Sequence, residues 1–173
     1  MALPRDYPDE NCPIARSLEV VGERWTLLIV RDAFYGVRRF TDFQTHLRIP
    51  KAVLSQRLTI LVEEGVLHTA ATASGGRDEY VLTAKGRRLW PVLRTLSHWG
   101  SENYQEAEER RTFAHVECGG PVDPQGMCGR CGKTPDPADV TTSPPQKLRV
   151  RRNDAISKAL QRPHRMLEPI QPT

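Results

Sequence analysis

Apolar positions recur at helical spacing near the start of the chain and predict two helices. The first begins at Pro13, a residue that suits the first turn of a helix because its missing N–H is not needed there, and it ends at Gly22. The second covers residues 24–35, is apolar on almost every side, and ends at Gly36. We expect this second helix to lie at the centre of the core.

Two further helices are predicted close together. Thr41 and Gln44 fit a capping box, in which the Thr side chain accepts from a free backbone N–H and the Gln side chain reaches back, so a short helix is expected over 42–47. Residues 48–49 then form a tight turn. Residues 50–64, opened by proline and stopped by a glycine, form the next helix. One face of this helix is apolar and should pack on the core, whereas the other face is small and hydrogen-bonding.

The pattern after these helices predicts a β-hairpin and a long final helix. Residues 66–70 and 79–82 have the composition of strands, and a turn rich in glycine separates them. Thr83 then caps a helix over 84–111, which Pro91 should kink because an interior proline costs about 3 kcal/mol. The expected fold is therefore mainly α with a small β-hairpin wing. Its order of elements is that of a winged helix-turn-helix, whose second helix fits the major groove of DNA.

This fold assigns candidate DNA contacts to the exposed side of the 50–64 helix and to its surroundings. Ser55 and Gln56 are placed to touch base edges, while Lys51 and Arg57, at the flanks of that face, are placed to reach phosphates. Any amphipathic helix pair would show a similar pattern, but the full order with a hairpin favours DNA binding. The complete set of candidate contacts is Arg38, Arg39, Arg48, Lys51, Ser55, Gln56, Arg57, Thr59 and, at the hairpin tip, Arg77.

A separate group of residues has the spacing of a metal site. His115, Cys118, Cys128 and Cys131 give the pattern H-x2-C-x9-C-x2-C, in which each close pair supplies two ligands from one turn. Soft thiolates in a reducing compartment favour Zn²⁺, so a structural Zn²⁺ is the only cofactor expected and none is required for DNA binding. The alternative is that these are reduced thiols in a loose segment.

No motif in the chain indicates catalysis. The five histidines are scattered, and the sequence contains no Gly-rich phosphate loop, no G-x-S-x-G elbow and no H-E-x-x-H helix. We therefore expect a protein that is not an enzyme. A zinc-ribbon adaptor that binds protein partners, with non-specific DNA binding, is the alternative function.

Short motifs occur along residues 12–104: Cys12-Pro13, Gly22-x-Arg24-Trp25, Arg39-Phe40, Leu54-Ser55-x-Arg57-Leu58, Glu64-Gly65 and Tyr80-x-Leu82-Thr83-x-x-Gly86. In these motifs the chain resembles HxlR-type bacterial transcriptional regulators. The resemblance implies a winged-helix homodimer, formed through the first and last helices, that binds a palindromic operator in double-stranded DNA. Such regulators often act on a nearby gene, and we expect this one to be a repressor. The apolar residues along the last helix could instead close the core of a single subunit. The expected interface residues are Ile14, Leu18, Trp90, Leu93, Leu96 and Trp99.

Cys12 is a candidate sensor of oxidants or electrophiles. It precedes Pro13 and so lies at the start of a helix, where backbone N–H groups stabilise a thiolate. Several regulators in the resembled family use a cysteine at this place for sensing. The alternatives are a small buried side chain without a sensing role, and control by a small-molecule effector bound between the dimer helices.

Composition and charge divide the chain into four segments. Hydrophobic residues make up 38% of the 173 residues, and the deficit is concentrated in a C-terminal part that is rich in proline. We expect a flexible N-terminus (1–11), a DNA-binding and dimerisation domain (12–111), the cysteine cluster (112–134) and a basic, disordered tail (135–173). No apolar run approaches the roughly 20 residues that cross a bilayer. A cytoplasmic protein without membrane contact is therefore expected.

Overall fold

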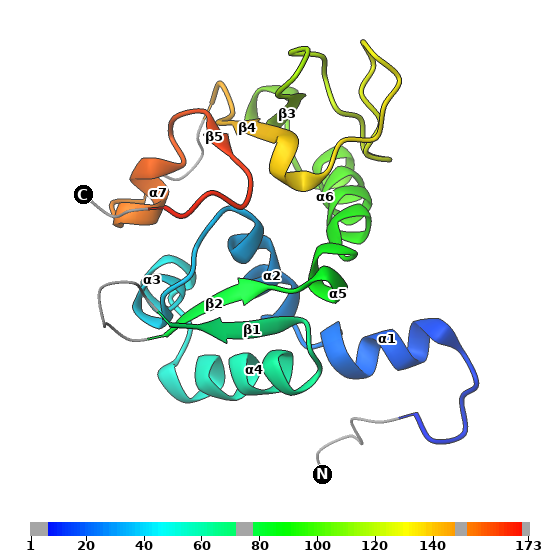
Figure 1. The fold of residues 1–173 in the computed structure, drawn as a ribbon, viewed down its shortest axis with the longest axis vertical. Coiled ribbons are helices and arrows are strands. Elements are labelled where there is room, and N and C mark those ends of the chain that lie inside the picture. Colours follow the sequence, from blue (N-terminus) through cyan, green and yellow to red (C-terminus); the bar gives the residue numbers. More distant parts are fainter. Residues whose placement is uncertain (1–6, 72–77, 148–151, 171–173) are drawn as a thin grey trace.

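The computed structural model describes residues 7–71, 78–147 and 152–170, which form two parts around one hydrophobic core (Figure 1). The first part runs from the N-terminus through the long helix at residue 104, and the second part is a C-terminal extension that folds back on it. The first part contains α1 (Pro13–Val21), α2 (Thr26–Phe34), α3 (Phe40–Leu47), α4 (Lys51–Glu63), β1 (Leu67–Ala70), β2 (Glu79–Leu82), α5 (Ala84–Arg87) and α6 (Trp90–Tyr104). The extension contains η1 (Ala107–Glu109), β3 (Thr112–His115), η2 (Pro137–Asp139), β4 (Val140–Ser143), α7 (Ala155–Ala159) and β5 (His164–Arg165).

Helix α2 is the centre of the core, as its apolar sequence predicts. Ile29, Val30 and Phe34 on this helix are fully buried. The turn from α3 to α4 is tight because Arg48 takes a left-handed conformation (φ 54°), and the next residue, Ile49, is buried. Helix α4 is also confirmed, with Pro50 as its N-cap and Gly65 (φ 64°) directly after its end.

The predicted capping box at the start of α3 is wrong. This helix begins at Phe40, its N-cap is Arg39, and no side-chain cap is formed. Thr41 therefore lies inside the first turn rather than in front of it. The reason is that Phe40 packs against the core, which extends the helix by two residues beyond the polar cap pattern.

The wing is confirmed over its described residues. Strands β1 and β2 pair antiparallel, with Leu67 opposite Leu82, and the hairpin tip at 72–77, which includes Arg77, lies outside the described residues. Thr83 caps α5 as predicted, because its Oγ1 accepts from the backbone N–H of Gly86 at 3.1 Å. The same hydroxyl donates to the carbonyl of Gly65 at 2.6 Å, so it joins the end of α4 to the wing.

The single helix expected over 84–111 is instead two helices followed by a strand. The chain turns at Arg88 and Leu89, between α5 and α6, and Pro91 lies in the first turn of α6. There its missing N–H leaves no hydrogen bond unmade, so the expected cost of an interior proline does not arise. After Tyr104 the backbone becomes extended at Gln105, and the chain continues into η1 and β3.

The expectation that 135–173 is a disordered tail is wrong for its described residues. Strands β3, β4 and β5 form one antiparallel sheet in that order, so the sheet also crosses the expected boundary at residue 134. Sparse apolar residues anchor the extension in the common core, because each of them is buried. They are Ile156, Leu160, Met166 and Ile170.

Backbone hydrogen bonds join the end of the extension to the loop after α2. The N–H of Leu167 donates to the carbonyl of Phe34 at 2.7 Å, and that of Ile170 donates to the carbonyl of Gly36 at 3.0 Å. Gly36 has a φ of 87°, and a Cβ there would lie 1.7 Å from the carbonyl oxygen of Glu168. This close approach requires glycine. Among the described residues, no helix is long and apolar enough to cross a membrane.

Candidate nucleic-acid interface and metal centre

The outer face of α4 is exposed in the described part of the chain and carries polar side chains. Leu54, Leu58 and Leu61 are buried on the inner face, which holds the helix against the core. The outer face exposes four candidate contacts, and α4 lies at the edge of the molecule beneath the hairpin (Figure 1). Residues 51–62 contain no acidic residue, so nothing on the first three turns repels phosphate. The four exposed side chains are Lys51, Ser55, Gln56 and Thr59.

Arg57 does not lie at the exposed flank of α4, and this expectation is wrong. Its side chain is only 10% exposed and its Nε lies 3.8 Å from the carboxylate of Glu23, in the segment between α1 and α2. Its Nη2 donates to Gln56 Oε1 at 3.1 Å. Arg57 lies beside the buried leucines of the inner face, and its guanidinium points to the segment between α1 and α2 instead of reaching outward. Arg57 therefore orients Gln56 rather than offering a free cation.

The other candidate arginines differ in their exposure and in the ion pairs that they already form. Arg48 is exposed on the turn before α4. Arg39 is exposed but lies 3.7 Å from Glu79 at the start of β2. Arg38 is half-buried, lies 3.6 Å from the same carboxylate, and donates to the carbonyl of Leu167 at 3.3 Å. Arg38 thus helps to attach the extension, and Arg48 and Arg39 remain the better placed to reach phosphate.

The surface expected to form a dimer interface is largely exposed in the single chain. Ile14 on α1 is 70% exposed and Trp99 on α6 is 57% exposed, with Leu18 and Leu96 also exposed. Helix α1 projects away from the rest of the molecule (Figure 1). Exposed apolar residues on two helices are typical of surfaces that bind another protein.

Trp90 and Leu93 belong to the subunit itself, so the placement of Trp90 at an interface is wrong. The Trp90 ring is buried, with its centroid 5.1 Å from that of Phe34 and 5.7 Å from that of Phe113. Leu93 is half-buried against the same core. The strand that returns after α6 brings Phe113 onto this side of the helix, and nothing in the helical period of α6 indicates that.

Cys12 is the N-cap of α1, as expected from its position before Pro13. The nearby backbone N–H groups of Ala15 and Ile14 lower the pKa of its thiol. The side chain is half-buried. A lowered pKa increases the thiolate fraction near neutral pH, and the thiolate is the reactive form.

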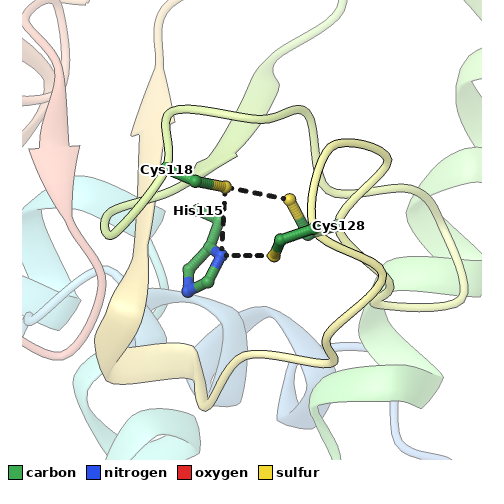
Figure 2. A group of neighbouring side chains, drawn as sticks. His115, Cys118 and Cys128 are labelled. Atoms are coloured by element: carbon green, nitrogen blue, oxygen red, sulfur yellow. Dashed lines mark hydrogen bonds between the residues drawn. The ribbon is translucent and has the colours of Figure 1, made fainter.

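The structure brings His115, Cys118, Cys128 and Cys131 together. One ligand atom from each residue lies within 4.8 Å of the others. Figure 2 shows the side chains of His115, Cys118 and Cys128 turned toward a common centre. Cys118 Sγ lies 3.4 Å from His115 Nδ1 and 3.4 Å from Cys128 Sγ, and Cys131 Sγ lies 3.3 Å from the same nitrogen. Zn–S and Zn–N bonds of usual length give edges of about 3.4–3.8 Å in a tetrahedron, so the donor set and its spacing fit Zn²⁺.

Glycines and backbone N–H groups shape this centre. A Cβ on Gly120 would lie 2.7 Å from Cys128 Sγ, so a larger residue there would push into the ligand. A hydrogen bond from the backbone N–H of Cys131, together with one from Arg130, lowers the pKa of Cys128 to about 6 despite the opposing effect of burial. The Cys118 thiol has a raised pKa, since burial and the neighbouring thiols outweigh its backbone hydrogen bond from Gly120. One thiolate is therefore already favoured at neutral pH, which suits metal binding.

Arg94 connects α6 to the loop between Cys118 and Cys128, and no pattern in the sequence indicated this contact. Its Nη2 donates to the carbonyls of Val122 and Asp123 at 3.2 and 3.3 Å, between the two ligand pairs. Its guanidinium carbon lies 3.8 Å from the centre of the Phe113 ring. The cysteine cluster is therefore attached to the helix that carries Trp99.

A buried polar cluster joins α3 to α7 and was also not predicted. His46 Nδ1 lies 3.0 Å from Asp154 Oδ1 and 3.2 Å from the hydroxyl of Ser157, while its Nε2 lies 3.8 Å from the buried carboxylate of Asp32. Burial raises the pKa of Asp154, but hydrogen bonds from Ser157 and from His46 lower it more. More than 100 residues separate His46 from Asp154, so no local pattern could pair them.

The helices α2, α3 and α4 followed by the β1–β2 hairpin define a winged helix-turn-helix, a class of DNA-binding transcriptional regulator. Comparison with known proteins supports this: the chain belongs to the family described as HxlR-like helix-turn-helix, whose model matches residues 20–108. The HTH-type transcriptional regulator Rv3095 of Mycobacterium tuberculosis is 42% identical over 137 residues, which cover 78% of this chain and 87% of that protein. YvaP of Bacillus subtilis, named in the same way, is 35% identical over 96 residues, or 54% of this chain and 89% of YvaP.

Two solved structures are similar in fold. The crystal structure of PA1607 matches with a TM-score of 0.60 and 39% identity, over 72% of this chain and 88% of that one. The redox regulator HypR in its reduced form matches with a TM-score of 0.50 and 28% identity, over 53% of this chain and 93% of that one. The protein is thus a transcriptional regulator with a winged helix-turn-helix.

Proposed function

We propose that the protein binds a palindromic operator as a homodimer and represses a nearby gene. The outer face of α4 carries this proposal, because it exposes Ser55, Gln56 and Lys51 without any acidic neighbour on its first three turns. Side chains of this kind approach base edges closely, and an amide can make two hydrogen bonds to adenine. Arg48 at the turn, with Arg39 before α3, is placed to hold the phosphates on either side.

A homodimer doubles the number of base pairs that the outer face of α4 can contact. One recognition helix contacts only a few base pairs, whereas two held about 34 Å apart reach successive major grooves on one side of the duplex. The exposed apolar residues of α1 and α6 offer a surface on which two copies could pair. Ile14, Leu18, Leu96 and Trp99 would form this interface in the proposal.

The experiment first identifies the operator and then substitutes a residue on the outer face of α4. Sheared host DNA captured by the purified protein and sequenced should yield a palindromic site. Gln56→Ala should then relax the preference at one base position in each half-site, at a cost of about 1–3 kcal/mol. Lys158→Ala, on the exposed side of α7, is the control and should bind as the wild type does. Equal affinity for the recovered site and for random duplex at low salt would overturn the proposal.

Cys12 is the proposed site of redox or electrophile control. Its lowered thiol pKa supports this, together with its place on α1 next to the exposed apolar residues. The similarity to a protein described as a redox regulator points the same way. Treatment with a quinone or a peroxide should release DNA from the wild type but not from Cys12→Ser. Equal release from both would remove Cys12 from the proposal.

A structural Zn²⁺ is proposed for the cluster of His115, Cys118, Cys128 and Cys131. The convergence of three thiols and an imidazole supports it, and the extension is the part that such an ion would stabilise. Protein purified without chelator should contain about one Zn²⁺ per chain. Cys128→Ser should contain much less and should unfold at a lower temperature, whereas Cys12→Ser should retain the ion. Less than half an equivalent of Zn²⁺ in the wild type would contradict this assignment.

A further inference from the structure

A cavity rich in arginine lies between α2, α6 and the C-terminal extension. Its volume is about 860 Å³, which is in the range of sites that enclose small molecules. Residues from all three parts form its walls, among them Trp25 and Arg31 from α2 and the segment before it, Ser101 from α6, and Arg111 and Leu160 from the extension. Neither the recognition face of α4 nor the cysteine cluster contributes to this cavity.

The described walls carry a large excess of positive charge. Glu109 is the one acidic residue in this lining, and it has an interaction partner of its own. Two of the cations are also paired, since Arg31 lies 2.7 Å from Asp32 and Lys147 lies 3.3 Å from Glu106. The four other cations form no ion pair within the described parts of the chain. These four are Arg94, Arg110, Arg111 and Arg152.

Several donors on these arginines are buried and have no hydrogen-bond partner among the residues that the structure describes. They include Nε of Arg94, Nε of Arg110 and Nη1 of Arg111. A buried donor without an acceptor is costly, and the cost is larger for a charged group. Burial lowers the pKa of Arg111, and the nearby charge of Arg31 lowers it further while Tyr35 opposes the effect. Within the described residues, these guanidinium groups therefore have no acidic partner in the cavity, which suits them to bind an anion.

The walls next to these donors are aromatic. The guanidinium carbon of Arg111 lies 5.4 Å from the centre of the Tyr35 ring, and Trp25 and Phe113 complete this side. Guanidinium groups bind carboxylates and phosphates through paired hydrogen bonds, and aromatic side chains bind apolar bodies. We propose that this cavity binds a small organic anion, with a carboxylate or phosphate group held by Arg110 and Arg111 and an aromatic body against Trp25 and Tyr35.

An occupant of this cavity would contact both the DNA-binding part and the extension. His46 and Leu47 at the end of α3 belong to its walls, and they directly precede the turn to α4. Arg152, in the extension, donates to the backbone carbonyl of His46 at 2.6 Å. The site is thus placed to affect the recognition helix. That role as an effector site rests on the proposed function, whereas binding of the anion does not require DNA at all.

Isothermal titration of the full chain with 1-naphthoate, 1-naphthyl phosphate and the uncharged 1-naphthamide tests the proposal without DNA. At least one of the two anions should bind, and the amide should bind at least about tenfold more weakly, because it lacks the charge that the arginines stabilise. The stronger of the two anions identifies the group that the site prefers. Equal binding of the amide and of both anions, or no binding of either anion at millimolar concentration, would overturn the proposal.

Variants locate the binding in the cavity. Arg110→Gln and Arg111→Gln should each weaken the preferred anion by about tenfold or more, as expected for one lost charge-assisted hydrogen bond. Arg87→Gln, an exposed change on α5, is the matched control and should bind as the wild type does. Arg110 is the safer variant for folding, since the one hydrogen bond of its side chain within the described residues is a long one, of 3.4 Å, to the carbonyl of Gln105. Unchanged affinity in folded Arg110→Gln and Arg111→Gln would place the anion elsewhere and refute the assignment.

Discussion

Gly36→Ala should detach the C-terminal extension from the DNA-binding part. The new Cβ would lie 1.7 Å from the carbonyl oxygen of Glu168, and the φ of 87° is unfavourable for alanine by about 1–2 kcal/mol. The backbone cannot keep both the turn and the contact. The hydrogen bonds from Leu167 to Phe34 and from Ile170 to Gly36 should break, at about 1 kcal/mol each, and the buried Ile170 side chain should lose about 1.5–3 kcal/mol of burial. The combined loss is roughly 4–7 kcal/mol, a large fraction of the stability of a typical domain.

Gly65→Ala provides the matched control for this variant. Gly65 also has a positive φ, of 64°, but a Cβ there has no neighbouring atom within 4 Å. It should therefore lose only the conformational cost of about 1–2 kcal/mol. Urea unfolding followed by tryptophan fluorescence measures both losses, and limited proteolysis reports whether the extension has become accessible. Equal loss of stability in the two variants, with the extension still protected in Gly36→Ala, would refute the reasoning.

Three further variants test the roles of single side chains. Lys51→Ala should weaken the binding of every duplex alike and should lower the slope of log affinity against log salt by about one, so a loss confined to the operator would contradict a phosphate contact. Arg57→Ala should lower the free energy of unfolding in urea by about 1–3 kcal/mol because it removes the buried partner of Glu23, and an unchanged stability with a reduced salt slope would show that Arg57 contacts DNA instead. Asp154 has a lowered pKa in the folded protein, so its contribution is complete above its unfolded pKa of about 3.9 and disappears as pH falls through the folded value. The stability difference between wild type and Asp154→Asn should therefore be large at pH 6 and small in strong acid, and a difference that does not depend on pH would contradict the contact with His46.

The helix-turn-helix and the wing could be predicted because their information is local. Proline and glycine mark the ends of α4, and Leu54, Leu58 and Leu61 repeat at the helical period. The left-handed conformation of Arg48 in the turn before α4 was not predicted. The cluster of His115, Cys118, Cys128 and Cys131 could be predicted for the same reason, since its four candidate ligands come from two short turns within 17 residues. In both cases the spacing along the chain fixes which side chains meet.

The remaining features depend on contacts between distant parts of the chain. The extension has few apolar residues of its own. It folds because Ile156, Leu160 and Met166 are buried in the core that it shares with the first part of the chain. The helical period places Arg57 at the edge of the exposed face of α4, but its partner, Glu23, comes from another element. No pattern within one helix could show either contact.

The close backbone approach at Gly36 also limits how this chain can be shortened. Met166 and Leu167 pack in the same core as Phe34, and the Phe113 ring lies against that of Trp90. A chain that stopped after α6 would keep every part of the helix-turn-helix, yet it would leave two large rings facing water. We therefore expect such a fragment to aggregate, and the smallest soluble unit that binds DNA should include the C-terminal segment.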